Sequence, residues 1–317
     1  MTERILVTGA GGFVGRELLR QLALREELTV VALDANPQSL PVASRLEIIR
    51  GDLTDPACRR AAIGSGVDAL VHLAAVPGGA AEADPVRSQR VNVEATLDLL
   101  REVASSARRP RVVFASTIAV YGDPLPQAGV DDSTPPAPRL IYGAHKAMIE
   151  TMIATLTRRQ AIDGLSLRLP GIIARPRGAA GMKSAFLSEV FHALKAGESL
   201  LVPVSPAATM WLMSVRRCAQ NIGHALQVDP RLLPATRACA LPALRLTMAE
   251  LVAEVARQLA CAAASIRFAP DEALEQAFGR YPPLTTRAAQ AAGFRSDETV
   301  AALVRSALES LETSEAP

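Results

Sequence analysis

The chain of 317 residues carries 34 basic and 32 acidic side chains, and 49% of its residues are hydrophobic. This length suffices for one large α/β domain or two smaller ones. The balanced charge excludes the strong positive field of nucleic-acid and membrane-surface proteins, and no apolar run approaches the roughly 20 residues of a membrane span. Since no basic and apolar leader precedes the first strand, we expect a cytoplasmic protein that binds a small molecule, not a nucleic acid or a membrane.

The cysteines and histidines indicate neither a disulfide framework nor a metal site. The cysteines form no C-x-x-C pair, and the histidines lie in separate segments without carboxylates at ligand spacing. We therefore expect no metal, and we interpret the cysteines as small buried apolar residues. They are Cys58, Cys218, Cys239 and Cys261.

In chain order, the first predicted strand, residues 5–7, runs into a glycine-rich turn and then a helical pattern. Glycines three residues apart let the backbone turn sharply and approach a phosphate, whose charge is favoured at the positive end of the helix dipole. A tight turn without a ligand is the alternative. The pattern predicts a dinucleotide cofactor that contacts Gly9, Gly12, Phe13, Val14 and Gly15.

The second predicted strand, residues 29–33, ends in Asp34. A carboxylate at this distance after the glycines can accept hydrogen bonds from the adenosine ribose hydroxyls, and it repels the 2′-phosphate of NADP. Asp34 therefore favours NAD as the cofactor, although an aspartate in this place can also simply cap a turn.

Further predicted strands over residues 45–50, 68–73 and 112–115 alternate with helical patterns. This alternation predicts an α/β fold with a Rossmann-type doubly wound parallel sheet. A carboxylate after the third strand can accept from the adenine amino group, with an apolar neighbour on the ring, and small residues after the fourth let a cofactor approach the backbone. The cofactor contacts expected from these two turns are Asp52, Leu53, Leu73, Ala74 and Ala75.

Candidate catalytic residues follow the fifth strand, which ends in Ser116 and Thr117. Tyr142 and Lys146 are four residues apart at the start of a predicted helix, so both project from one face. A tyrosine titrates near ~10, and a nearby ammonium lowers this value toward that of a useful base. Thr117 would fix the substrate oxygen while Tyr142 takes its proton. A simple surface pair is the alternative.

An amphipathic helix expected over residues 85–104 carries Asn92 in its middle. An asparagine there either faces solvent or holds a water or a main-chain carbonyl near the active site.

Several motifs together resemble the extended short-chain dehydrogenase/reductase family, the NAD-dependent epimerase/dehydratase group. They are TGAGGFVG, GDLTD, VHLAA, the helix with Asn92, FASTIAVYG and YGAHK. The resemblance implies that Thr117, Tyr142 and Lys146 form the family's catalytic triad and that Asn92 is its additional active-site residue. It also implies that Lys146 bonds the nicotinamide ribose and that Pro170, after strand 165–169, lies at the nicotinamide.

The substrate is less directly indicated. Sugar-nucleotide epimerases usually continue this strand with an Asn-Val-Tyr-Gly-Pro-like segment, whereas this chain reads RLPGIIARPRGAAG, which is similar to the D-erythronate dehydrogenase branch. That branch oxidises C2 of a four-carbon sugar acid; an NDP-sugar epimerase or dehydratase with tightly held NAD is the alternative. A carboxylate substrate needs a cation. The candidate substrate contacts are Ser116, Thr117, Tyr142, Arg175, Lys183, Trp211 and Arg216.

The prediction for the whole chain is a NAD-binding domain over residues 1–170 and a mainly substrate-binding lobe over residues 171–317, some of whose segments return to the sheet. Arg216 is expected at the start of a helix of that lobe, and Trp211 is expected either in the pocket floor or in the core. Helices near residues 85–104 and 142–160 are more apolar than one side of a sheet needs. In the family such helices pair into a four-helix bundle, so we expect a homodimer.

Overall fold

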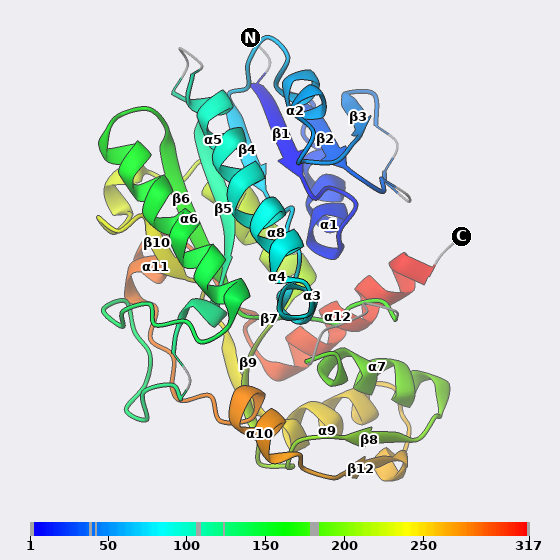
Figure 1. The fold of residues 1–317 in the computed structure, drawn as a ribbon. Helices are drawn as coiled ribbons and strands as arrows, with labels where there is room; N and C mark the ends of the chain where they lie inside the picture. Colours follow the sequence, from blue (N-terminus) through cyan, green and yellow to red (C-terminus); the bar gives the residue numbers. More distant parts are fainter. Residues whose placement is uncertain are drawn as a thin grey trace.

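A parallel sheet of seven strands forms the centre of the computed structural model, which describes residues 3–37, 40–41, 43–105, 109–122, 124–177 and 184–315 (Figure 1). The strand order is β10-β6-β5-β4-β1-β2-β3, and the order reverses between β1 and β4. Such a reversal opens a crevice at the carboxyl ends of the strands. The strands are β1 (Glu3–Thr8), β2 (Leu28–Asp34), β3 (Leu46–Arg50), β4 (Ala69–His72), β5 (Arg111–Thr117), β6 (Asp163–Leu169) and β10 (Ala238–Ala240).

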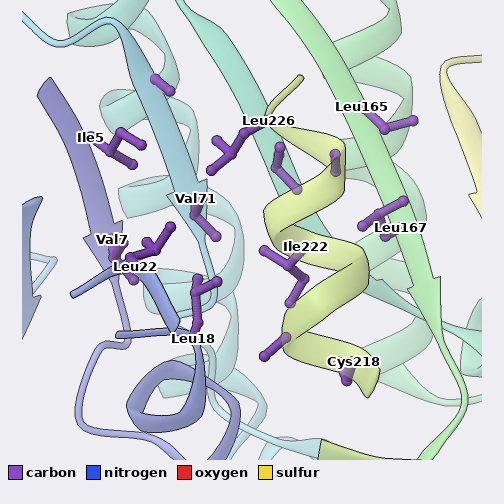
Figure 2. Packing of buried hydrophobic residues seen from close by; sticks show 14 of the residues in the cluster. Ile5, Val7, Leu18, Leu22, Val71, Leu165, Leu167, Cys218, Ile222 and Leu226 are labelled. Atoms are coloured by element: carbon purple, nitrogen blue, oxygen red, sulfur yellow. The ribbon is translucent and has the colours of Figure 1, made fainter. Parts of the chain in front are cut away.

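Helices cover both faces of this sheet, as the apolar strands require. On one face α1 (Phe13–Leu22) and α8 (Val215–Ala225) pack over Ile5, Val7 and Val71 (Figure 2). On the other face lie α2 (Pro56–Ile63), α5 (Thr96–Ala104) and α6 (Ile141–Arg158), which share a second apolar cluster. The predicted doubly wound Rossmann-type fold is confirmed.

The helix predicted over residues 85–104 is not continuous. It consists of α4 (Pro85–Gln89), a π-helical turn η1 (Arg90–Ala95) and α5. A π-turn is a wide turn that interrupts α-helical spacing and is often found at functional sites. Asn92 lies in this turn, so the hydrophobic periodicity located the helical segment but not its interruption.

The second half of the chain builds smaller sheets beyond the carboxyl ends of the main strands (Figure 1). One sheet contains β7 (Gly171–Ile173), β9 (Thr209–Ser214) and β11 (Leu244–Thr247), and the other β8 (Leu200–Val202) and β12 (Ile266–Phe268). Short 3₁₀ turns are η2 (Ile118–Val120), η3 (Pro230–Leu232) and η4 (Ala263–Ser265). The remaining helices are α3 (Gly78–Ala83), α7 (Phe186–Ala196), α9 (Met248–Gln258), α10 (Glu272–Phe278), α11 (Arg287–Ala291) and α12 (Val300–Glu315).

The expected boundary near residue 170 falls between β6 and β7. Beyond it, β10 pairs with β6, and α8 packs against α1, so both return to the main sheet. Cys218 and Cys239 are buried as expected, but Cys261 is exposed and Cys58 half-buried, because neither of these two lies in the centre of a cluster. No helix among the described residues is both long and apolar enough to cross a bilayer, and a cytoplasmic location stays a prediction.

Candidate active site

The glycine-rich turn contacts the segment that follows β4. Gly9 has a φ of +69°, and a Cβ on it would lie 2.5 Å from the nitrogen of Ala74 and 2.7 Å from the carbonyl carbon of Leu73. Only glycine permits both this backbone conformation and this approach. Two segments that the sequence analysis assigned to the cofactor, the glycine turn and residues 73–75, are therefore neighbours at the carboxyl ends of β1 and β4.

The helix α1 begins directly after this turn. Its N-cap is Gly12, and no side chain caps its first turn, which contains Phe13, Val14 and Gly15. The first backbone N–H groups of a helix have no acceptor within the helix, and together with the helix dipole they favour an anion. The turn has no room for a Cβ, and the helix start has no side-chain cap. Both features fit the binding of a dinucleotide pyrophosphate.

Asp34 lies at the end of β2 and is half-buried. One carboxylate oxygen accepts from the N–H of Gly11 at 2.9 Å, and the other accepts from the N–H of Asn36 at 2.8 Å. Asp34 therefore closes a local turn and also fixes the glycine turn. Neither contact prevents it from binding a ribose. Each carboxylate oxygen can accept a further hydrogen bond, as a ribose requires.

Gly11 was missed by the sequence analysis. A Cβ on it would lie 2.6 Å from the carbonyl oxygen of Asn36 and 3.1 Å from a carboxylate oxygen of Asp34. The consecutive Gly11 and Gly12 in the motif were the available signal.

The two residues assigned to adenine have different surroundings. Asp52 is exposed, and its carboxylate accepts from the backbone and hydroxyl of Thr54. Leu53 is buried in the apolar cluster under α5, and its carbonyl oxygen accepts from the guanidinium of Arg59 at 2.9 Å. Leu53 thus supports this edge of the crevice from within the core.

Asn92 is buried, so the solvent-facing alternative is wrong. Its amide oxygen accepts from the N–H of Val76 at 2.7 Å, and its amide nitrogen donates to the carbonyl oxygen of Val76 at 2.9 Å. The same nitrogen donates to the hydroxyl of Ser88 at 3.1 Å, and that hydroxyl contacts Nδ1 of His145 at 3.0 Å. Asn92 thereby fixes the chain directly after residues 73–75, and Ser88 and His145, not recognised in the sequence, join α4 to α6.

The start of α6 lies against the turn that follows Thr117. A Cβ on Gly143 would overlap the carbonyl oxygen of Ala119 in η2. The side chain of Thr117 accepts from the N–H of Ala119 at 3.1 Å, which leaves its hydroxyl hydrogen available to a ligand. Tyr142 and Lys146 occupy successive turns of α6. Glycine between these two residues therefore permits the close packing that brings the predicted triad to one place.

Lys146 is buried, and its ammonium donates to the carbonyl oxygen of Ala115 at 2.7 Å. It lies 4.5 Å from the centroid of the Phe114 ring and 5.7 Å from that of Tyr142. Burial lowers the pKa of Lys146 to about 7, and the charge of Glu150 opposes this shift. The carboxylate of Glu150 thus favours the ammonium form against the effect of burial.

Tyr142 differs electrostatically from the sequence-based expectation. Burial raises its pKa to about 12, and the charge that opposes this shift is that of Arg175. The expectation assigned that effect to Lys146, whose ammonium is instead bonded to Ala115. Tyr142 and Arg175 are therefore electrostatically coupled neighbours, although 33 residues separate them in the chain.

Arg175 follows β7 and reaches back over the glycine turn. Its guanidinium carbon lies 5.5 Å from the centroid of the Phe13 ring. Its backbone is held from both sides by α7, because its N–H donates to Ser188 at 2.9 Å and its carbonyl oxygen contacts Nε2 of His192 at 2.7 Å. Among the described residues no carboxylate pairs with this guanidinium. It is a fixed, half-buried cation beside Tyr142, available to an anionic ligand.

The other predicted substrate contacts lie in different parts of the structure. Arg216 is exposed and pairs with Glu309 at 2.7 Å, because α8 packs on the main sheet and not in the second lobe. Trp211 is fully buried in the core, where its indole N–H donates to the carbonyl oxygen of Pro282 at 2.7 Å. Ser116 is buried too, and its hydroxyl donates to Glu150. These three are corrections to the predicted substrate contacts.

Two further predicted residues complete the set. Pro170 is buried between β6 and β7, near the point where the chain enters the crevice. Lys183 lies outside the described residues.

Comparison with known proteins agrees with this geometry. The sequence matches the NAD dependent epimerase/dehydratase family over residues 5–228. It is 34% identical to the D-erythronate dehydrogenase of Cupriavidus necator over 96% of this chain and 98% of that protein. It is 28% identical to the D-erythronate dehydrogenase of Haemophilus influenzae over 96% of this chain and 99% of that protein.

Among solved structures, the fold is similar to that of a nucleoside-diphosphate-sugar epimerase from Agrobacterium tumefaciens. The TM-score is 0.85 at 27% sequence identity, with coverage of 97% of this chain and 94% of that one. The region that matches the family contains the glycine turn, Asn92, Thr117 and the Tyr142–Lys146 pair. The sequence, the fold and the positions of these residues agree: the chain belongs to the NAD-dependent epimerase/dehydratase family.

Proposed function

We propose that this NAD-dependent dehydrogenase oxidises a secondary hydroxyl of a small, D-erythronate-like sugar acid, at C2, to the 2-oxo acid. The observation that carries the choice of substrate is the guanidinium of Arg175. It lies beside Tyr142, its backbone is fixed by α7, and no carboxylate among the described residues neutralises it. A planar guanidinium binds a carboxylate through two parallel hydrogen bonds. The relationship to D-erythronate dehydrogenases supports the same substrate class.

The proposed roles follow from position. Thr117 donates its hydroxyl hydrogen to the substrate oxygen, Tyr142 takes the hydroxyl proton, and Arg175 holds the carboxylate. The phenolate of Tyr142 is favoured by the charge of Arg175, to which the Lys146 ammonium adds from 5.7 Å, and Lys146 also bonds the cofactor ribose. The glycine turn and Asp34 would hold NAD, which would supply the acceptor for the hydride of the substrate carbon. The lobe formed mainly by residues 171–317 supplies the substrate contacts, with Arg175 at its entrance.

The cofactor is predicted to be NAD and not NADP, because the carboxylate of Asp34 lies where a 2′-phosphate would need a cation. Replacing Asp34 with alanine should weaken NAD binding by ~1–3 kcal/mol through lost hydrogen bonds to a charged group. Titration calorimetry measures this change, with thermal unfolding of the unliganded variant as the control for the lost contacts to Gly11 and Asn36. Catalytic efficiency with NADP equal to that with NAD would contradict the assignment.

Tyr142→Phe should remove nearly all turnover and leave the affinity for NAD almost unchanged, because it deletes only the proton acceptor. Lys146→Met should damage both properties, since its ammonium has two roles. Single-turnover kinetics together with NAD titrations separate these effects. Retention of a tenth of the wild-type rate in Tyr142→Phe would mean that another group is the base.

Arg175→Ala should lower the catalytic efficiency for the best sugar acid by ~30- to 1000-fold, equivalent to ~2–4 kcal/mol, mainly through KM. Arg216→Ala is the matched control and should change little, because its guanidinium pairs with Glu309. Arg175→Lys should recover only part of the loss, since an ammonium lacks the planar fork.

The assay is NADH formation with four- to six-carbon aldonates and uronates, each compared with a neutral polyol of equal length. If Arg175→Ala leaves the preference of the enzyme for the acid over the polyol intact, the sugar-acid assignment loses its physical basis. An enzyme that forms no net NADH but interconverts a sugar nucleotide would instead be the epimerase alternative.

A homodimer through a four-helix bundle is the proposed assembly. Val86 on α4 is 80% exposed and Met148 on α6 is 54% exposed, and the two helices contact each other on one face of the sheet. A second copy of the chain would cover both side chains if the two helices form the interface. Light scattering at micromolar concentration should give the mass of a dimer, and Met148→Glu should shift it toward the monomer. A monomeric mass for the unmodified chain would refute this assembly.

A further inference from the structure

A buried ion pair lies directly behind the catalytic residues and has no part in the roles assigned so far. Glu150 on α6 and Arg168 on β6 are 5% and 6% exposed. The guanidinium donates to both carboxylate oxygens, through Nε at 3.0 Å and through Nη2 at 2.8 Å. Such a bidentate pair holds both side chains in one orientation.

Both ends of this pair are bonded further. Ser116 lies directly opposite Arg168 in the register of β5 and β6, and its hydroxyl donates to Glu150 at 2.5 Å. On the other side, Nη1 of Arg168 donates to the hydroxyl of Tyr121 at 3.1 Å. The chain Ser116, Glu150, Arg168 and Tyr121 therefore connects β5, α6, β6 and the loop after η2.

A buried pair of this kind is weak evidence for a purely stabilising role. Removing two charges from water is costly, and well-packed apolar residues often replace such pairs without loss of stability. Its position offers another explanation. Glu150 is four residues after Lys146, so both side chains lie on one face of α6. They bond successive residues of β5, Lys146 to the carbonyl oxygen of Ala115 and Glu150 to the hydroxyl of Ser116.

We propose that Glu150 is a positioning residue of the active site: held by Arg168 and Ser116, its carboxylate keeps Lys146 protonated and fixes α6 against the strand that ends in Thr117. The inference rests on the proposed role of Lys146 as an ammonium. Burial alone disfavours that charge, and Glu150 is the group that opposes the effect of burial.

The other groups around Lys146 do not supply a negative charge. His72 on β4 is neutral, because burial and then the charge of Lys146 lower its pKa to about 3. Tyr142 lies one turn before Lys146, and burial raises its pKa to about 12.

The remaining neighbours are cations or neutral groups. Arg175 and Arg168 are both cations. Tyr121 stays neutral since burial raises its pKa. The ring of Phe114 adds a weak cation–π contact.

The direct test is the titration of Lys146 itself. The lysines of the chain are Lys146, Lys183 and Lys195, so protein labelled with ¹³C at the lysine ε-carbon gives few signals, and Lys146→Arg assigns the relevant one. In Glu150→Gln the midpoint of the Lys146 titration should fall by about one pH unit or more, since loss of a close opposite charge disfavours the ammonium. Two controls should leave the midpoint unchanged: Ser116→Ala, which keeps the carboxylate, and Glu254→Gln, a surface change on α9.

Glu150→Gln leaves the charge of Arg168 buried without a partner and can unfold the protein. The double variant Glu150→Gln with Arg168→Met removes both charges and avoids this outcome; its Lys146 midpoint should also fall, but by less, because loss of the Arg168 cation partly offsets loss of the carboxylate. An unchanged midpoint in a folded Glu150 variant overturns the proposal. Failure of both variants to fold would assign the pair to the fold alone and would overturn it as well.

The pH dependence of activity provides a second measurement. It would not change if Glu150 had only a structural role. Where the proposed function holds, the high-pH limb of catalytic efficiency should shift to lower pH in the Glu150 variants, while Ser116→Ala should lower kcat at all pH values without shifting that limb. The labelled titration needs no substrate. A shift in the titration without any sugar-acid oxidation would therefore count against the proposed function and leave the role of Glu150 standing.

Discussion

The close contact between Gly143 and Ala119 is the constraint on which the candidate active site depends. Tyr142 and Lys146 are carried by α6, whereas Thr117 is carried by β5, and only the first turn of the helix brings them together. Any Cβ at position 143 would overlap the carbonyl oxygen of Ala119, so the approach requires glycine. The same device operates at the cofactor side, where Gly9 approaches Ala74. Short-range backbone packing at two glycines thus determines where the reactive side chains lie.

Burial then gives these side chains their electrostatic character. The site contains two cations, of which Lys146 is buried and Arg175 half-buried, and removal of water disfavours the charge of each. Lys146 is supported by a carbonyl oxygen and by Glu150, which is itself held by Arg168. Arg175 has no such partner among the described residues and lies over an aromatic ring. This contrast separates a cation whose charge is supported by the protein's own groups, Lys146, from one that is left without a carboxylate partner, Arg175.

The similarity to known proteins and the geometry of the site contribute different information. The fold is shared with epimerases and dehydrogenases alike, so it establishes the family and not the substrate. The feature that we propose distinguishes a sugar acid from a sugar nucleotide is local: side chains of α7 fix the backbone of Arg175, and the charge of its guanidinium acts on Tyr142. The proposal thereby places substrate choice in the segment in which this sequence departs from the epimerase pattern.

The sequence by itself determined the doubly wound sheet, because apolar strands alternate with helical patterns, and it located the cofactor turn through its glycines. It also proposed Asn92, Thr117, Tyr142 and Lys146 as active-site residues, since local motifs and a family resemblance point to them. Contacts between distant segments were beyond it. The burial of Trp211, the pairing of Arg216 with Glu309 and the Glu150–Arg168 pair depend on which faces of separate elements meet. Periodicity assigns a residue to a face, but only the packed fold decides what that face contacts, and the pKa of a buried group depends on that contact.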